Sequence, residues 1–391
     1  MRMIYADYAA AAPTFQSVRV CMGEALELSG NPSAPHVFGR SLRKAIEGVR
    51  RRVAQFAHAR PEHVIFTSSG SESNALALRG AVAWKPGDVL ITSAIEHASL
   101  AATATELSAL GVEVRTLSVN AGGRISLSEL ESLFNARVRM VSVMHANNET
   151  GVIQPIEDMC RIVAERAQTL GIRRPLVHTD ACQSAPWNML ARTSVCDLVS
   201  FNAAKVHGPL GVGVLVARTT IPSPLIHGGG QEWGVRGGSE NVSGVAGLGA
   251  ALEELGHDDV RGDAIALLRD AVWTQVHDAD PSIIRVGQEP FLPGHLCLIA
   301  PGAPGEDTML AMEDRGVCVG VGAACQSGKG TQSHVLAAMG IHPNLVTSAV
   351  RITIGRGIAQ EDAPRIAEAY LASIAEVRSR YQSVSVSSVA Y

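Results

Sequence analysis

Short apolar runs alternate with helix-like segments from about residue 64 to about residue 215 of this 391-residue chain. The clearest runs are Val64–Thr67, Val89–Thr92 and Val138–Met144. Apolar runs of this length, rich in Val and Ile, are typical of buried strands. Because strands that alternate with helices form parallel sheets, the pattern predicts an α/β fold whose mostly parallel sheet lies between helices.

The rest of the chain predicts a second, smaller domain. A helical run from about residue 245 to 276 leads into it, a β-type run follows at Val350–Gly355, and a helix over 363–380 is expected to pack on its sheet. We therefore expect a large domain over residues 16–257 and a smaller α+β domain over residues 258–391.

Polar residues stand directly after the expected strands. Glu96 and His97 follow one run, and Asn148 follows another. In an open parallel sheet the carboxyl ends of the strands lie side by side, where ligands bind. A single histidine there is more often a structural hydrogen bonder, so only the repeated pattern predicts a ligand site.

The segment Ser68–Asn74 predicts a small-residue turn between a strand and a helix. Such a turn offers free backbone N–H groups and a positive helix end to a phosphate. An ordinary serine-rich helix cap explains this segment equally well.

Asp180 and Lys205 each follow a further apolar run. This pair suits pyridoxal phosphate, because that cofactor needs a lysine for its attachment and a buried carboxylate that keeps its ring nitrogen protonated. Taken alone, the pair is weak evidence, since an aspartate after a strand is commonly a helix cap.

With these residues in place, the chain resembles the class V, fold-type I pyridoxal phosphate enzymes. It is most similar to the cysteine desulfurases of the bacterial iron–sulfur assembly and nitrogen-fixation type. The resemblance runs nearly end to end, and the matching segments are Asp7–Ala11, Asn31–Arg40, Phe66–Asn74, Ile95–His97, His145–Pro155, His178–Gln183, His227–Glu232, Arg236–Asn241, Gly322–Ser327 and Val350–Gly355.

The resemblance implies pyridoxal 5'-phosphate as the cofactor and assigns the main roles around it. Lys205 matches the lysine that attaches the cofactor and acts as the base, Asp180 the partner of the ring nitrogen, and His97 the imidazole that stacks on the ring and assists proton transfer. The other implied cofactor contacts are Gln183, Asn148, Gly70, Ser71, Asn202 and Ser239. No metal site is expected.

The resemblance also implies the substrate and the partners. Arg351 matches the arginine that holds the carboxylate of L-cysteine, and Asn31 is a second expected substrate contact. Ser239 matches a hydroxyl that reaches the neighbour's cofactor phosphate, which implies a homodimer with shared sites. Residues 1–15 are expected to associate with the small domain, as in the family.

Cys325 differs in context from the other six cysteines, which show no C-x-x-C pair. It lies in a stretch rich in Gly and small residues, so we expect a loop there. In the family this is the position of the nucleophilic thiol, which carries sulfur as a persulfide to an acceptor protein.

Two positions depart from the family pattern, because Asn202 and Ala204 stand where it has Ser and His. Ala204 has no side-chain donor for a phosphate. We expect a retained but weaker hold on the phosphate, and His207 is a candidate to compensate. The stretch 330–332 also departs from the usual sequence, which affects the choice of partner more than the chemistry.

Charge and composition bear on the expected partners and location of the protein. The formal net charge is −4 with 18% charged residues, so direct nucleic-acid binding has no global electrostatic support. No run of eighteen apolar residues occurs and the first residues lack the apolar core of a signal peptide, so we expect a cytoplasmic protein that does not enter membranes.

Three alternatives stay open. A selenocysteine or cysteine lyase shares every cofactor residue, an epimerising or transaminating relative would not need Cys325, and a non-catalytic sulfur-carrier or scaffold subunit is suggested only by Ala204. The sequence does not name the sulfur acceptor, which could serve iron–sulfur clusters, tRNA thiolation, cofactor synthesis or sulfur modification of DNA.

Overall fold

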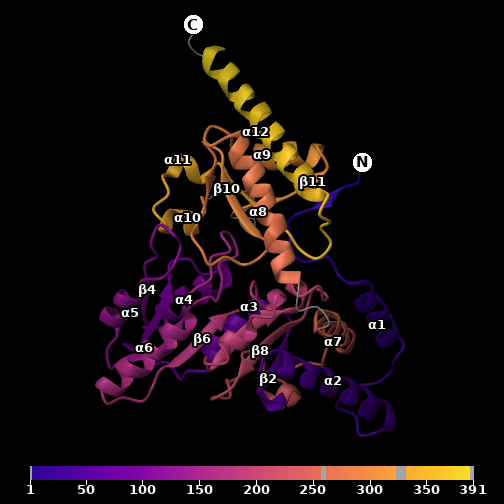
Figure 1. Cartoon of the computed structure of the whole chain (residues 1–391). Coiled ribbons are helices and arrows are strands. Elements are labelled where there is room, and N and C mark those ends of the chain that lie inside the picture. The colour runs from indigo at the N-terminus through magenta and orange to yellow at the C-terminus, as the bar shows by residue number, and fades with distance from the viewer. Residues whose placement is uncertain (1, 257–260, 323–331, 388–391) are drawn as a thin grey trace.

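The computed structural model describes residues 2–256, 261–322 and 332–387. Figure 1 shows two lobes, with the earlier part of the chain in the lower lobe and most of the later part in the upper one. Each lobe is built on its own sheet, and helices pack against both sheets.

The large lobe contains a seven-stranded sheet. Strand β8 is antiparallel to both of its neighbours, and the other pairs are parallel. The mostly parallel sheet predicted from the sequence is thereby confirmed. In spatial order the strands are β2 (Val64–Thr67), β8 (Gly213–Ala217), β7 (Leu198–Asn202), β6 (Leu176–Asp180), β5 (Val138–Ser142), β3 (Val89–Ser93) and β4 (Glu113–Leu117).

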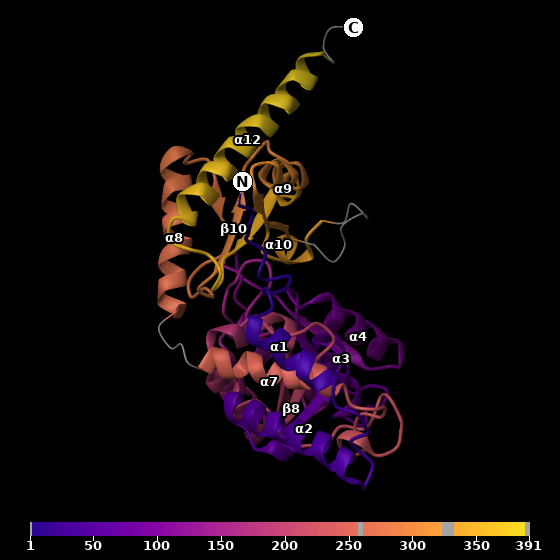
Figure 2. The same cartoon turned by 90° about the vertical axis from the view of Figure 1, so that its right-hand side faces the viewer.

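Successive strand residues point to opposite faces of this sheet, and each face has its own apolar core. Val89 and Ile91 join the core under one layer of helices, while Leu90 between them joins the core on the other face. The first layer comprises α2 (Val37–Phe56), α5 (Leu127–Leu133), α6 (Ile156–Thr169) and α7 (Val242–Gly256). The second comprises the helical turns over 76–80 and α4 (Ala98–Ala109). Helix α1 (Gln16–Leu26) lies beside α7 (Figure 2).

The small lobe contains an antiparallel sheet in the order β12 (Gly320–Val321), β13 (Ala349–Thr353), β10 (His295–Ile299) and β9 (Ile284–Arg285). Its helices are α8 (Arg261–Ala279), α9 (Gly305–Asp314), α10 (His334–Ala338), α11 (Pro343–Val346) and α12 (Asp362–Ser387). The first residues of the chain also lie here, because β1 (Ile4–Tyr5) pairs in parallel with β11 (Val317–Cys318).

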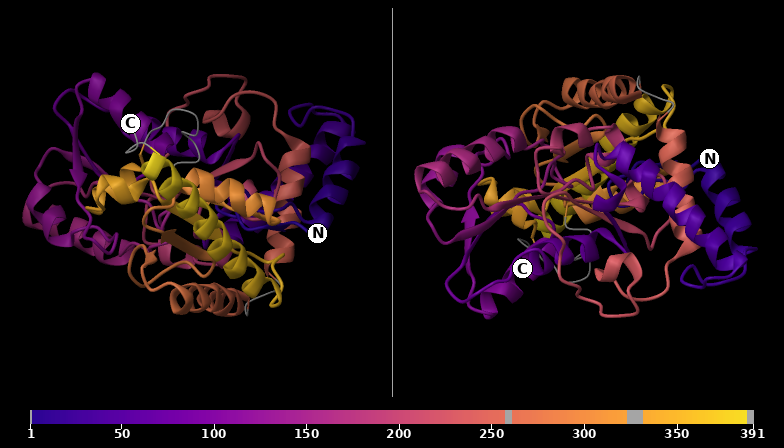
Figure 3. Two further views of the ribbon diagram at one scale, coloured as in Figure 1. Left: turned by 90° about the horizontal axis from the view of Figure 1, so that it is seen from above. Right: turned by 90° about the horizontal axis from the view of Figure 1, so that it is seen from below.

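Two helices differ from the sequence prediction. The expected run over 245–276 is described as α7 and α8, which pack in different lobes, because α7 contacts α1 and α2 while α8 contacts α12 (Figure 2). Seen from above, the yellow helix α12 crosses in front of the rest of the chain (Figure 3, left). The predicted domain boundary between residues 257 and 258 lies outside the described residues. The helix expected over 363–380 continues to Ser387.

Candidate active site

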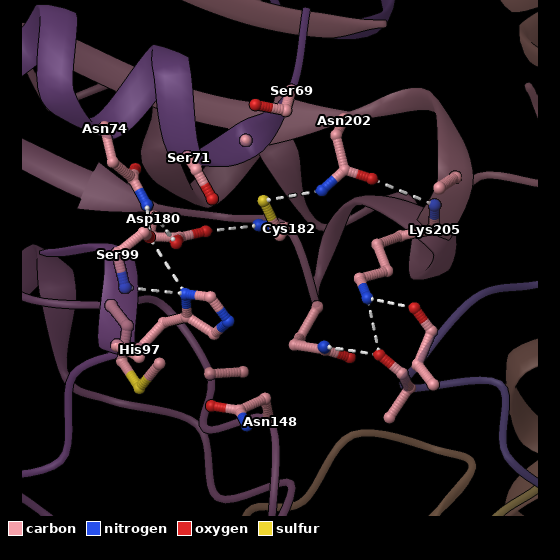
Figure 4. A pocket seen from close by; sticks show the side chains of 18 of the residues that line it. Ser69, Ser71, Asn74, His97, Ser99, Asn148, Asp180, Cys182, Asn202 and Lys205 are labelled. Carbon is pink, nitrogen blue, oxygen red and sulfur yellow. Dashed lines mark hydrogen bonds between the residues drawn. The ribbon is translucent and has the colours of Figure 1, made fainter. Parts of the chain in front are cut away.

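A cavity of about 450 Å³ lies beyond the carboxyl ends of the central strands, as expected for an open parallel sheet. Residues after β2, β3, β5, β6 and β7 line it, and the small lobe adds Gly322, His334 and Arg351. Figure 4 shows Asp180 and His97 on one side of this cavity and Lys205 on the other. The site therefore combines segments that are far apart in the sequence.

Lys205 lies in a short helical turn directly after β7. The side-chain oxygen of Asn202 accepts a hydrogen bond from the Lys205 backbone N–H at 3.2 Å and so caps that turn. The Nζ of Lys205 donates to the carbonyl oxygens of Ala9 and Ala10, at 2.6 and 2.5 Å. Burial lowers the pKa of Lys205 below its ordinary value. This shift makes the neutral amine, which can attack a carbonyl or accept a proton, more accessible than in a solvent-exposed lysine.

Asp180 ends β6 and is almost completely buried. One carboxylate oxygen accepts a hydrogen bond from Nδ2 of Asn74 at 2.7 Å, and the other accepts from the backbone N–H of Cys182 at 2.9 Å. Both donors fix the carboxylate at the cavity wall. Sequence reasoning did not assign a role to Asn74, although it closes the conspicuous segment Ser68–Asn74.

His97 is the N-cap of α4 and lines the cavity. Its Nδ1 accepts a hydrogen bond from the backbone N–H of Ser99 at 3.1 Å. That bond assigns the ring proton of a neutral imidazole to Nε2. Burial lowers the pKa of His97, so the neutral ring, which can stack on a flat ligand, is the favoured form.

The turn between β2 and α3 (Gly70–Ala75) forms another wall of the cavity. A Cβ at Gly70 would lie 2.9 Å from both Nδ2 of Asn202 and Sγ of Cys182, so any larger residue here would force one of these side chains to shift. Nδ2 of Asn202 donates to Sγ of Cys182 at 3.3 Å. Ser71 and Ala204 also line the cavity.

His207 does not take the place of the donor that Ala204 lacks. Its Nδ1 is 2.8 Å from the carbonyl oxygen of Pro13, and its ring stacks on Phe15 with centroids 4.2 Å apart. It is not among the residues that line the 450 Å³ cavity. The expectation that His207 replaces the donor missing at Ala204 is therefore wrong for this arrangement of the side chain.

Arg351 on β13 adds a guanidinium group to the cavity wall. Nη1 donates to the carbonyl oxygen of Asn148 at 2.9 Å, and Nη2 donates to the Asp7 carboxylate at 2.7 Å. Nε is buried and has no hydrogen-bond partner among the described residues. A buried N–H without a partner is costly, and a planar guanidinium is suited to binding a carboxylate. Nε2 of Gln183 donates to Ala9 at 3.1 Å.

Three expected residues are not brought into this cavity by the described part of the chain. Asn31 is exposed, and its side chain accepts a hydrogen bond from the N–H of Ser33 at 2.9 Å. Ser239 is also exposed, on the segment before α7. Cys325 lies outside the described residues, whereas Gly322 and His334 on either side of it line the cavity.

Two buried glutamates near the cavity were not assigned a role from the sequence. Burial raises the pKa of Glu96 to about 8 and that of Glu149 to about 7. For Glu96, the folded protein keeps a proton that an unfolded chain releases near its ordinary pKa of 4.5. Its contribution therefore makes the fold less stable as pH rises from about 4.5 to about 8.

The residues fit a flat, charged cofactor that carries a phosphate. The cavity offers a buried amine, a buried carboxylate opposite it, a neutral imidazole, and a small-residue turn where a Cβ at Gly70 would intrude. Such a set of groups defines a pyridoxal-phosphate-dependent enzyme of the α/β class. Within residues 2–256, 261–322 and 332–387, no cluster of three or more His, Cys, Asp or Glu side chains could hold a metal ion.

The chain belongs to the Aminotransferase class-V family, whose profile matches residues 4–366. A cysteine desulfurase IscS of Dictyoglomus turgidum is 36% identical over 371 residues, 92% of each chain. A cysteine desulfurase of Cereibacter sphaeroides is 36% identical over 87% of each chain. Sequence and site together put the chain among the pyridoxal-phosphate-dependent cysteine desulfurases of this family.

Solved structures agree with this membership. A NifS-like protein superposes with a TM-score of 0.84 at 30% identity, covering 94% of this chain and 98% of that one. A structure described as SspA in complex with cysteine gives a TM-score of 0.78 at 30% identity, covering 90% and 98%. In the part of the chain that the structure describes, no helix combines the length and apolar character needed to cross a membrane.

Proposed function

We propose that this cysteine desulfurase binds L-cysteine through Arg351, uses Lys205 as its base, and passes the sulfur to Cys325. The observation that carries the proposal is that a guanidinium and a lysine amine line one cavity. Nε of Arg351 has no partner in the described chain, and burial lowers the pKa of Lys205. Both line the same 450 Å³ space.

The cavity residues would hold pyridoxal phosphate between Lys205 and Asp180, with the phosphate at the turn that contains Gly70 and Ser71. When bound, this cofactor supplies an electron sink for the substrate's Cα. Asp180, held by Asn74 and the Cys182 N–H, would keep a proton on the facing nitrogen.

Each remaining residue then has one task. Arg351 binds the substrate carboxylate and so points the Cα hydrogen at the amine of Lys205, which accepts it as a neutral base. The His97 ring would lie against the flat face of the cofactor. Gln183 and Asn148 would contact the cofactor's ring edge.

Sulfur transfer to Cys325 is a displacement at the sulfur atom of the substrate. The thiolate of Cys325 attacks the sulfur of L-cysteine, the S–S bond of a persulfide forms, and the Cβ–S bond of the substrate breaks with its electron pair remaining on carbon. Protonation of that carbon and return of the Cα proton from Lys205 complete L-alanine. The products, one L-alanine and one persulfide, balance one L-cysteine and one enzyme thiol.

Further partners are part of the proposal. A homodimer would bring Ser239 to the neighbour's phosphate site, which agrees with the exposure of Ser239. The persulfide would pass to an acceptor protein. Six cysteines in the described chain are free, which agrees with a reducing, cytoplasmic setting. Asn31, exposed in the single chain, would contact substrate only after rearrangement or assembly.

The proposal is tested by measuring L-alanine release from L-cysteine, with a thiol reductant present, for the native holoenzyme, Lys205→Ala and Cys325→Ala. We expect loss of alanine release in both variants. Full alanine release by Cys325→Ala, with sulfide as co-product, would instead establish a lyase. Absence of turnover in the native protein would support a carrier or scaffold role.

A further inference from the structure

The carboxyl group of Glu149 is held in a fixed place at the edge of the cavity. The side-chain oxygen of Asn147 accepts hydrogen bonds from the backbone N–H groups of Glu149 and Thr150, both at 2.9 Å. Nδ2 of Asn147 donates to the carbonyl oxygen of Ile95 at 3.1 Å. The turn after β5 is thus tied to the neighbouring strand end, and only 3% of Glu149 is exposed.

This carboxyl group is joined to the small lobe through Ser333. Oγ of Ser333 donates to Oε2 of Glu149 at 2.6 Å and accepts from the backbone N–H of Leu336 at 3.1 Å. Ser333 is therefore both the N-cap of α10 and the partner of Glu149. Next to it, Nε2 of His334 lies 2.9 Å from the carbonyl oxygen of Glu96.

The same glutamate oxygen lies against Gly322. A Cβ at Gly322 would lie 2.7 Å from Oε2 of Glu149 and 3.7 Å from Cβ of Ser333. The carboxyl oxygen that accepts from Ser333 therefore occupies the space beside Gly322.

Glu149 lines the cavity, but the cofactor and substrate contacts proposed above use other residues. The Arg351 charge opposes the rise in the pKa of Glu149, and burial and the Glu149 charge raise the pKa of Cys297. Neither residue forms a hydrogen bond to Glu149 in the described chain. Burial raises the pKa of Glu149 to about 7, while the Ser333 hydroxyl and the Arg351 charge partly offset that rise. Such a costly buried carboxyl indicates a specific role for its contacts.

We propose that Glu149 is a positioning residue for sulfur transfer, because its carboxyl group joins Ser333, which follows Cys325 by eight residues and caps α10, to the large lobe beside Gly322. The inference rests on the proposed role of Cys325 as the sulfur acceptor. It predicts that Glu149 affects the transfer of sulfur to Cys325, while cofactor and substrate binding depend on other residues.

The test compares the holoenzymes Glu149→Ala, Ser333→Ala and the double variant with the native protein. Ser126→Ala is the matched control, because Ser126 caps another short helix, α5, by accepting from the Glu129 N–H, away from the cavity. Each protein is mixed with L-cysteine without reductant. The cofactor absorbance reports substrate binding, and mass spectrometry of quenched samples reports the persulfide on Cys325.

We expect Glu149→Ala and Ser333→Ala to form the persulfide about 10-fold more slowly, with little change in the absorbance step, since small misplacements of reacting groups have effects of this order or larger. The double variant should be no slower than Glu149→Ala. Hydrogen exchange of the amides near Leu336 should increase in both single variants but not in Ser126→Ala.

Native persulfide rates in both folded variants would overturn the proposal. So would a loss of cofactor binding in Glu149→Ala, because the residue would then support the cofactor site. If Glu149→Ala does not fold, the Ser333→Ala rate alone decides, and a native rate rejects the proposal. Failure of the proposed function has a different signature, namely native alanine and no persulfide on Cys325 in the native protein.

Discussion

Replacement of Arg351 by lysine tests how the site holds its substrate. The side chain is buried on β13, where Nη1 donates to Asn148 and Nη2 donates to Asp7, while Nε has no hydrogen-bond partner in the described chain. Lysine keeps the charge but has no planar fork of donors, so it cannot satisfy these partners and a carboxylate together.

The magnitude follows from the contact that is lost. A hydrogen bond to a charged group contributes about 1.5–3 kcal/mol. Loss of one such bond weakens binding roughly 10- to 150-fold. We therefore expect the dissociation constant of L-cysteine to rise by this factor in Arg351→Lys, while that of cysteamine, which lacks the carboxylate, stays nearly unchanged.

The assay is a titration of the cofactor absorbance of the holoenzyme with each compound. Arg378→Lys is a suitable control, because Arg378 bonds to Pro301 and Asp280 in the small lobe away from the cavity. The thermal midpoint of each variant checks the fold. Equal weakening of L-cysteine and cysteamine, or no weakening of either, would refute the assignment of Arg351 to the carboxylate.

Three more predictions concern the cofactor site and its surroundings. Asp180→Asn should keep the cofactor but lower kcat about 100-fold, as is common when a charge that stabilises the reacting state is removed; native kcat would contradict its role. Gly70→Ala should weaken cofactor binding about 10-fold in an absorbance titration of the apoenzyme, because its Cβ would meet Asn202 and Cys182 at 2.9 Å. Glu96→Gln cannot titrate, so its stability in urea relative to the native protein should increase from pH 5 to pH 9 by a few kcal/mol. A constant difference across that range would mean that Glu96 has no raised pKa.

Much of the fold could be predicted from the sequence because the strands of the large lobe are buried on both faces. Continuous apolar runs such as Val64–Thr67 and Val89–Thr92 have no other simple explanation, and their carboxyl ends locate the cavity. The run over 245–276 was harder. Helix α7 continues to Gly256 and α8 begins at Arg261, and their different packing partners are set by tertiary contacts that no local pattern reveals.

Part of the site was also predictable from the sequence, namely the side chains at the strand ends. Lys205, Asp180 and His97 stand at strand ends and meet at the cavity. The backbone carbonyls of Ala9 and Ala10, which accept from Lys205, carry no side-chain signal at all.

Other contributors depend on distant segments that fold together. Glu149 lies in the matching segment His145–Pro155, but its contact with Ser333 joins residues that are 184 positions apart in the sequence. Cys182 is buried, and it also lines the cavity, where it accepts a hydrogen bond from Asn202. Ser239 and Asn31 stay predictions, because both are exposed and neither lines the cavity in the described chain.

The most direct test of the central claim is a single turnover of the holoenzyme with excess L-cysteine and no reductant. L-alanine and persulfide are counted per protomer in the native protein and in Cys325→Ala. We predict about one alanine and one persulfide, located on Cys325, in the native protein, and neither in the variant, as the balance of the displacement requires. Alanine formation by Cys325→Ala at the native rate would contradict the account.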